Sequence, residues 1–145
     1  MKTSPTLLAL LCLGLFGASE LHAQEDQIHT PGVGSAERTG ILDALHLEYT
    51  TGSGSKVKFK VNYLKVHNGW AWIKVVPLNP DGEAEGDEWP SLLRLRAGGW
   101  SLQHPEEVMD GLDESEGPQT PSRRFVQALK KKYPEMPTDI IPVSR

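Results

Sequence analysis

The sequence predicts an α+β domain: an antiparallel β-sheet built from two or more hairpins, with an N-terminal and a C-terminal helix packed on it. Apolar residues recur at helical spacing over 36–48 and again over 123–133. Between these segments, apolar and polar residues alternate, and turn residues divide the alternating part into hairpins. The order helix, hairpin, hairpin, helix is typical of an α+β fold rather than of repeated βα units.

The N-terminal segment has the layout of a secretory signal peptide. A single early lysine precedes an apolar run, and small and polar residues follow as far as Ala23. The run is shorter than the ~20 residues of a membrane-spanning helix. We therefore expect residues 1–23 to be removed and the protein to be exported, periplasmic or extracellular, without stable membrane insertion. Cys12 is the only cysteine, so the processed chain is expected to be free of disulfides.

Residues 24–34 are polar and contain a proline and two glycines, which favours a flexible lead-in. Ser35 is a suitable N-cap for a helix over 36–48, whose apolar residues form one stripe. From this point residues 35–145 are expected to form a single domain.

The first hairpin is predicted from its turn. Asn68-Gly69 favours a two-residue type I′ turn with His67 opposite Trp70. A change of phase in the alternation at Tyr63 and Leu64 predicts a bulge there. One face of this hairpin then carries Leu64, Val66, Ala71, Ile73 and Val75. The other face carries Lys65, His67, Trp70, Trp72 and Lys74.

The second hairpin is predicted over 92–104, with Gly98-Gly99 as its turn, Ala97 opposite Trp100, and the Trp100 ring in the core. Acidic segments at 81–88 and 105–119 are interpreted as solvated, flexible loops.

A last helix is expected to open at 120–122, with Pro121 at its first position. We expect it to stop at Pro134, and the apolar pair Ile140 and Ile141 to attach the tail to the body.

The sequence favours no catalytic or metal chemistry. The four histidines of the processed chain, at 29, 46, 67 and 104, lack the spacing of metal ligands, and no cofactor motif is present. Asp43 and His46 are three residues apart on the first helix and would act as an acid-base pair only inside a pocket. The net charge of −4 gives no basic surplus for a nucleic-acid partner.

The face of the first hairpin that carries the two tryptophans is the candidate binding site. Trp70 and Trp72, with Lys65, Lys74 and His67, would stack on a flat anionic ligand or meet the aromatic residues of a partner. In the alternative interpretation, the last helix or the tail covers both rings and the lysine stems pack along them. The sequence leaves both interpretations open.

Three segments together resemble a group of short, exported, uncharacterised bacterial proteins. They are AERTGILDAL (36–45), KFKVNYLKVHNGWAWIKVVPLNPDG (58–82) and WPSLLRLRAGGWSL (89–102). In that group an "ER…ILDAL" helix precedes an "LxVxxGWA" hairpin. The resemblance covers about half of the processed chain; it implies a bacterial, exported origin and assigns no catalytic residue. The order of elements also fits cystatin-like and nuclear-transport-factor-like folds, by analogy only.

We therefore expect a small, exported binding or accessory domain that acts through a sheet face on a protein or envelope component. One alternative is a cone-shaped enzyme or ligand-binding protein with a pocket between sheet and helix, lined by Tyr63 and Trp70 or Trp72, with Asp43 or His46 as base. Another is an inhibitor or immunity-type protein, which the acidic loops favour.

Overall fold

The computed structural model describes residues 27–50 and 57–144. The predicted signal peptide at 1–23 and the start of the lead-in lie outside the described residues. The elements run in the order α2 (Ala36–Glu48), β1 (Lys58–His67), β2 (Trp70–Leu78), β3 (Trp89–Arg96), β4 (Gly99–Gln103) and α3 (Arg123–Lys132). Three short 3-10 helices are η1 (Pro105–Val108), η2 (Glu114–Glu116) and η3 (Thr138–Ile140). The predicted α+β class is confirmed.

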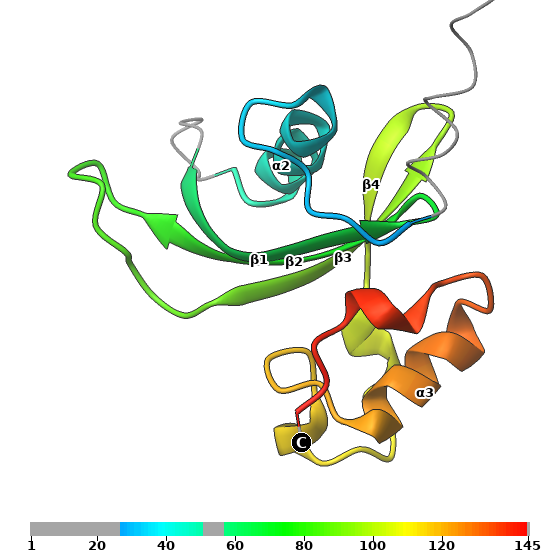
Figure 1. Cartoon of the computed structure of the whole chain (residues 1–145). Helices are drawn as coiled ribbons and strands as arrows, with labels where there is room; N and C mark the ends of the chain where they lie inside the picture. Colours follow the sequence, from blue (N-terminus) through cyan, green and yellow to red (C-terminus); the bar gives the residue numbers. More distant parts are fainter. Residues whose placement is uncertain (1–26, 51–56, 145) are drawn as a thin grey trace, which may run out of the picture.

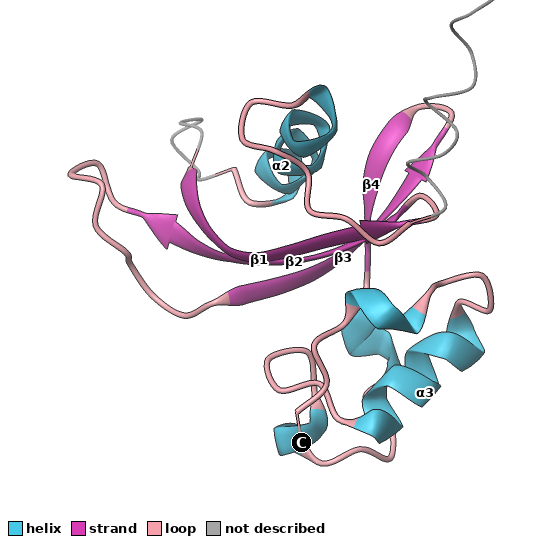
Figure 2. Ribbon diagram, viewed as in Figure 1, coloured by secondary structure: helices cyan, strands magenta, loops and turns pink. Residues whose placement is uncertain are grey.

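The four strands form one antiparallel sheet in the order β1-β2-β3-β4. Figure 1 shows α2 over one face of this sheet, and α3 with the C-terminal tail on the other. After β4 the described chain contains only helices and loops (Figure 2). The sheet is therefore a central layer with a cover on each face, and none of the described helices is long and apolar enough to cross a membrane.

The first hairpin has the predicted turn and register. Asn68 and Gly69 have φ values of 48° and 70°, the two positive values that a type I′ turn requires. His67 pairs with Trp70, and the register shifts between Val61 and Tyr63. The predicted bulge is thus present, and it keeps the aliphatic residues on one face of β1 despite the change of phase.

The second hairpin corrects the predicted register by two residues. The turn is Ala97-Gly98, so that Leu95 rather than Ala97 lies opposite Trp100. Gly99 begins β4 with a φ of 107°, a conformation that glycine adopts without strain, and this moves the turn one residue toward the N-terminus. A shift of two residues preserves side-chain parity, so the predicted faces still hold.

The α2 face of the sheet is aliphatic. Its buried cluster consists of Ile41, Ala44, Leu45, Leu64, Val66, Ala71, Ile73, Val75 and Leu93. Trp100, expected in the core, is partly buried and packs against this cluster from β4. It approaches α2 closely at Gly40, where an added Cβ would lie 3.1 Å from Trp100 Cδ1. The glycine therefore makes room for the indole ring.

The opposite face is covered by the C-terminal segment. Its buried cluster consists of Trp70, Trp72, Leu92, Phe125, Val126, Leu129, Met136, Ile140 and Ile141. The predicted attachment of the tail is thus confirmed. The start of the last helix is a correction: Ser122 is the N-cap and accepts a hydrogen bond from the backbone N–H of Phe125 at 3.1 Å. This capping bond fixes the first helical residue as Arg123, so Pro121 precedes the cap.

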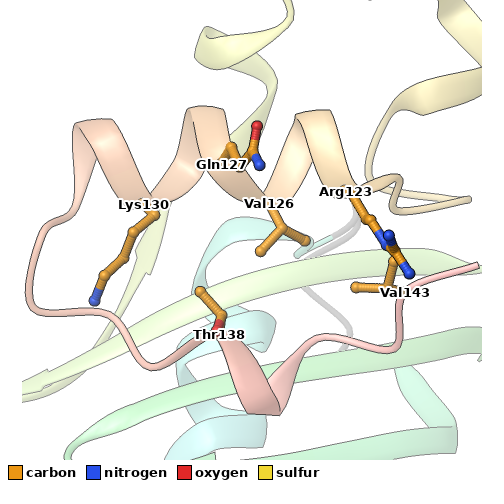
Figure 3. A pocket seen from close by; sticks show the side chains of 6 residues that line it. All are labelled: Arg123, Val126, Gln127, Lys130, Thr138 and Val143. Atoms are coloured by element: carbon orange, nitrogen blue, oxygen red, sulfur yellow. The ribbon is translucent and has the colours of Figure 1, made fainter.

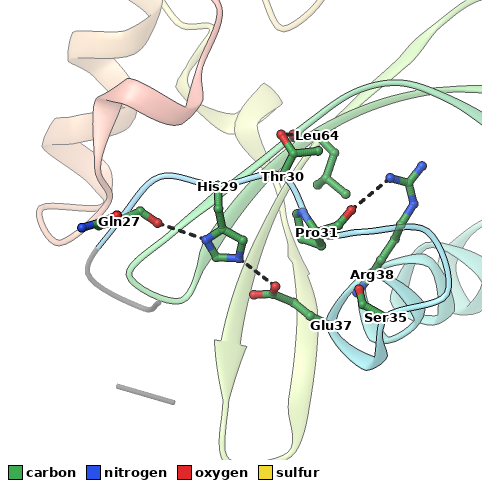
Figure 4. Close-up of polar contacts among 8 residues, drawn as sticks. All are labelled: Gln27, His29, Thr30, Pro31, Ser35, Glu37, Arg38 and Leu64. Atoms are coloured by element: carbon green, nitrogen blue, oxygen red, sulfur yellow. Dashed lines mark hydrogen bonds and ion pairs between the residues drawn. The ribbon is translucent and has the colours of Figure 1, made fainter. Parts of the chain in front are cut away.

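The lead-in is another correction, because its described part is bound to the sheet edge. His29 forms an antiparallel bridge with Val66, and the Thr30 hydroxyl donates a hydrogen bond to the Leu64 carbonyl at 3.1 Å. Arg38 donates from α2 to the Pro31 carbonyl at 3.2 Å (Figure 4). Residues 27–34 thereby satisfy backbone groups of β1 that would otherwise lie at an open edge.

The acidic segment 105–119 also has more structure than the composition predicted. It contains η1 and η2, and Val108, Met109 and Leu112 pack against the C-terminal cluster. Its acidic side chains reach the cations of α3: Glu107 pairs with Lys132, and Glu116 pairs with Arg124 at 2.7 Å. The three apolar side chains, spaced along an otherwise polar segment, are sufficient to attach it to the body.

Candidate functional site

The two indole rings of the first hairpin are buried. Trp70 is 2% exposed and Trp72 is 0% exposed. The Trp70 ring lies 5.5 Å from that of Tyr133, and Trp72 meets Phe125 edge-on at 6.3 Å, both between ring centroids. The guanidinium of Arg94 lies over Trp70, 4.9 Å from its centroid. Of the two interpretations of the sequence, the structure therefore supports the second: the C-terminal segment covers both rings, and the indoles form no exposed platform.

The polar members of that face connect the sheet to the C-terminal segment. The Nδ1 atom of His67 lies 2.9 Å from the carboxylate of Asp139 in η3. Lys74 pairs with Glu88 at 2.9 Å and donates a hydrogen bond to the Gln119 carbonyl at 3.0 Å. Lys65 is half-buried. His67 and Lys74 thus connect the sheet to segments that follow it in the sequence.

The residues expected to line an enzyme pocket lie on different faces of the sheet. His46 stacks on Phe59, with 5.1 Å between ring centroids, and its Nε2 atom lies 2.6 Å from the Val57 carbonyl. Asp43 Oδ1 is 3.8 Å from His46 Nδ1. Tyr63 packs on the opposite face, where its hydroxyl donates to the Ile140 carbonyl at 3.0 Å. The structure thus does not bring Tyr63 together with Asp43 and His46.

A different site opens beyond the end of β4. Because β4 stops at Gln103, opposite Leu92, the first residues of β3 extend past it. A groove of about 270 Å³ lies there, and we call it the aromatic groove. Its lining residues are Tyr49, Trp89, Pro90, Pro105, Glu106, Pro118 and Gln119.

The aromatic groove is assembled from four separate segments. Tyr49 is the C-cap of α2, and Trp89 begins β3. Their ring centroids are 4.4 Å apart, and Phe59 of β1 supports Trp89 edge-on at 6.0 Å. The rest of the lining comes from Pro90, from η1 and from residues 118–119, and Lys74 donates a hydrogen bond to the Gln119 carbonyl. The two rings are half-buried, so part of their surface is left to contact a ligand.

The surroundings of the aromatic groove are acidic. Segment 81–88 leads directly into Trp89, and segment 105–119 supplies four of the lining residues. Together these two segments hold 11 of the 19 Asp and Glu residues and contain no Lys or Arg. Hydrogen bonds from Asn62 and Lys74 hold the pKa of Glu88 below its ordinary value, so this carboxylate keeps its charge. The groove therefore lies in a negative field.

A second groove, of about 290 Å³, lies between α3 and the tail. Arg123 and Lys130 stand toward its two ends, and Thr138 faces α3 from the tail (Figure 3). Lys130 donates a hydrogen bond to the Met136 carbonyl at 2.8 Å. The two grooves thus carry opposite charges. In neither part of the described chain, 27–50 or 57–144, do His, Cys, Asp and Glu gather in a group that could hold a metal ion.

Sequence reasoning missed the aromatic groove because its residues share no local pattern. The sequence pattern predicts a helix over 36–48 and a hairpin over 92–104, and both Tyr49 and Trp89 lie just outside these ranges. The available signal was a tryptophan beside a proline, placed at the end of one acidic segment while two further prolines lie in the other. Comparison with known proteins finds no matching family model, no matching curated protein and no matching solved structure.

Proposed function

We propose that this protein is a small, exported binding domain that holds an extended segment of a partner protein in the aromatic groove. The observation that supports this proposal is the Tyr49–Trp89 ring pair, half-buried at the mouth of a groove. Both sheet faces are covered by the chain's own helices. The proposed contact surface is therefore the groove at the end of the sheet, and not the sheet face that the sequence suggested.

The chemistry of the lining favours recognition of a chain segment. Aromatic rings at a surface bury a large apolar area when a partner covers them, and they are enriched in protein interfaces. Pro90, Pro105 and Pro118 have fixed φ angles and no N–H group, so these walls lose little entropy on binding. A volume of about 270 Å³ is at the lower limit of small-molecule sites, roughly 300 Å³, and matches one or two side chains of a peptide.

The same surface also favours the inhibitor or immunity-type alternative. Such a protein blocks a target by surface and charge complementarity, and the acidic segments beside the groove provide the charge. A binding domain and an inhibitor differ in what happens to the partner after binding, but both would use this one contact site. One experiment can therefore locate the surface for both roles.

Site-specific photocrosslinking in the native envelope tests the proposal. A photoreactive residue placed at Gln119, whose side chain is exposed, should capture a discrete partner. The matched control carries the same residue at Leu47, which is 85% exposed on α2 and lies outside the groove. Trp89→Leu keeps an apolar side chain beside Tyr49 but removes the indole surface, and should abolish capture at Gln119. Equal capture at Leu47, or capture that Trp89→Leu leaves unchanged, would contradict the proposal.

A further inference from the structure

The lining of the aromatic groove combines two aromatic rings with one carboxylate. Tyr49 and Trp89 present ring surfaces, and Glu106 in η1 is the charged residue among the lining side chains. Glu106 is exposed, and its Oε1 atom lies 3.1 Å from His104 Nδ1. An aromatic face beside a carboxylate is the combination that recognises an ammonium or guanidinium group, through the ring quadrupole and an ion pair together.

Within residues 27–50 and 57–144, basic side chains pair with only some of the carboxylates around the groove. Three of them pair with the protein's own cations: Glu88 with Lys74, Glu107 with Lys132, and Glu116 with Arg124. Eight further acidic residues lie in the same two segments. Among the described residues, no Lys or Arg lines the groove. The remaining negative charge therefore attracts a cation from outside the chain.

The protein already contains a contact of the same kind on the C-terminal face of the sheet. Arg94 stacks over Trp70 with 4.9 Å between its guanidinium carbon and the ring centroid, and Glu135 pairs with that guanidinium. The ring comes from β2, the guanidinium from β3 and the carboxylate from the tail, so the chain itself supplies all three groups of this triad. In the aromatic groove, the described lining residues supply two rings and a carboxylate but no Lys or Arg side chain.

We infer that the segment bound in the aromatic groove presents a lysine or arginine side chain, whose head lies against the Tyr49–Trp89 pair with Glu106 as its counter-ion. This inference rests on the proposed function, because it specifies the chemistry of the segment that the groove holds. The α3 groove, flanked by Arg123 and Lys130, repels the same side chain. The two grooves of one molecule thus provide an internal control for the sign of the charge.

Three synthetic peptides test the inference: acetyl-Ala-Pro-Xaa-Pro-Ala-amide with Xaa as Lys, Gln or Glu. Their binding to the purified protein is followed by the NMR signal of the Trp89 indole N–H, assigned through its loss in Trp89→Phe. We expect the Lys peptide to bind about three- to tenfold more tightly than the Gln peptide, as ~1 kcal/mol of cation–π and ion-pair energy implies. The Glu peptide should bind most weakly, and added salt should reduce the preference for Lys.

The variant Glu106→Gln should remove most of the preference for the Lys peptide. Glu135→Gln is the matched control, because this exposed glutamate pairs with Arg94 outside the groove and should leave the preference unchanged. If the Gln peptide binds as tightly as the Lys peptide and shifts the Trp89 signal, the inference of a cation fails while the proposed function stands. If none of the three peptides shifts that signal, the proposed function fails and the inference with it. Preference for the Glu peptide overturns the inference directly.

Discussion

The two faces of the sheet are covered in different ways. On the α2 face, aliphatic side chains of β1, β2 and β3 lie under a helix that directly precedes the strands in the sequence. On the other face, Trp70 and Trp72 lie under α3 and the tail, which follow them by more than fifty residues. Side-chain alternation placed the residues of β1 and β2 on the correct faces. It did not show which part of the chain would cover the aromatic face.

The difference also appears in the polar contacts. On the C-terminal face, the tail is connected to the sheet by Tyr63 through the Ile140 carbonyl and by His67 through Asp139. The segment that crosses this face closes a long loop, at an entropic cost that grows slowly with length. Directional hydrogen bonds fix the register of the tail, whereas the buried residues of the α2 cluster are all aliphatic. The two faces should therefore respond differently to substitution.

The largest effect is expected from Trp72→Ala. Removal of a fully buried indole ring should lower the free energy of unfolding by about 3–5 kcal/mol. The cost should fall toward the lower value, because Trp72 Nε1 has no hydrogen-bond partner in the described part of the chain and its loss removes an unsatisfied donor. Urea unfolding followed by far-UV circular dichroism measures the change.

Ile73→Ala is the matched variant on the α2 face, with an expected loss of about 2–5 kcal/mol. Trp72 and Ile73 are consecutive residues of β2 and lie in the two different clusters. Because the two clusters share this strand, both variants should unfold in one cooperative transition. Two separate transitions in Trp72→Ala would show instead that the C-terminal face unfolds independently of the α2 face.

A smaller loss, about 1–3 kcal/mol from overpacking, is expected for Gly40→Leu on the α2 face. A Cβ at this position already approaches Trp100 Cδ1 to 3.1 Å, so a branched side chain must displace the indole. Thr39→Leu, at the exposed neighbouring position of α2, is the control and should change stability little. Thermal unfolding gives the loss, and a shift in tryptophan fluorescence reports the displaced ring. A fully stable Gly40→Leu variant would show that β4 can move away from α2 at no energetic cost.

Tyr63→Phe is expected to cost about 0.5–1.5 kcal/mol, the usual net value of one hydrogen bond. The variant keeps the ring in the C-terminal cluster and removes only the bond to the Ile140 carbonyl. Amide hydrogen exchange in η3 should become faster, while exchange in α2 should not change. Equal acceleration on both faces would mean that this bond stabilises the whole domain and does not act specifically on the tail.

The sequence predicts those features of the structure that depend on residues close together in the chain. Asn68-Gly69 sets a turn within four residues, and its register was therefore predictable. Ala97-Gly98-Gly99 permits two turns of the same parity, and the local sequence does not distinguish between them. The aromatic groove depends on Tyr49 and Trp89, forty residues apart, meeting prolines from two further segments. Sequence periodicity does not predict contacts between residues so far apart.

The smallest expected effect concerns His29, which joins the lead-in to the α2 layer. Burial lowers the pKa of this imidazole. Two contacts act in the opposite direction: a hydrogen bond with the Gln27 carbonyl, and the Glu37 carboxylate 2.8 Å from Nε2 (Figure 4). These contacts outweigh burial, so the pKa of His29 is raised above its ordinary value of 6.5. Since the folded state binds the proton more tightly, the stabilisation is complete below about pH 6.5 and disappears as the pH rises through the folded-state pKa.

An NMR titration of His29 in the parent and in Glu37→Gln measures this directly. The variant should have the lower pKa, and the difference in stability between the two proteins should be present at acidic pH and vanish above the folded-state pKa. Glu135→Gln, on the far side of the sheet, should leave the titration unchanged. A His29 pKa at or below 6.5 in the parent would mean that burial outweighs the ion pair with Glu37. The α2 layer would then depend on apolar packing and uncharged hydrogen bonds alone, and the contrast between the two faces would be sharper.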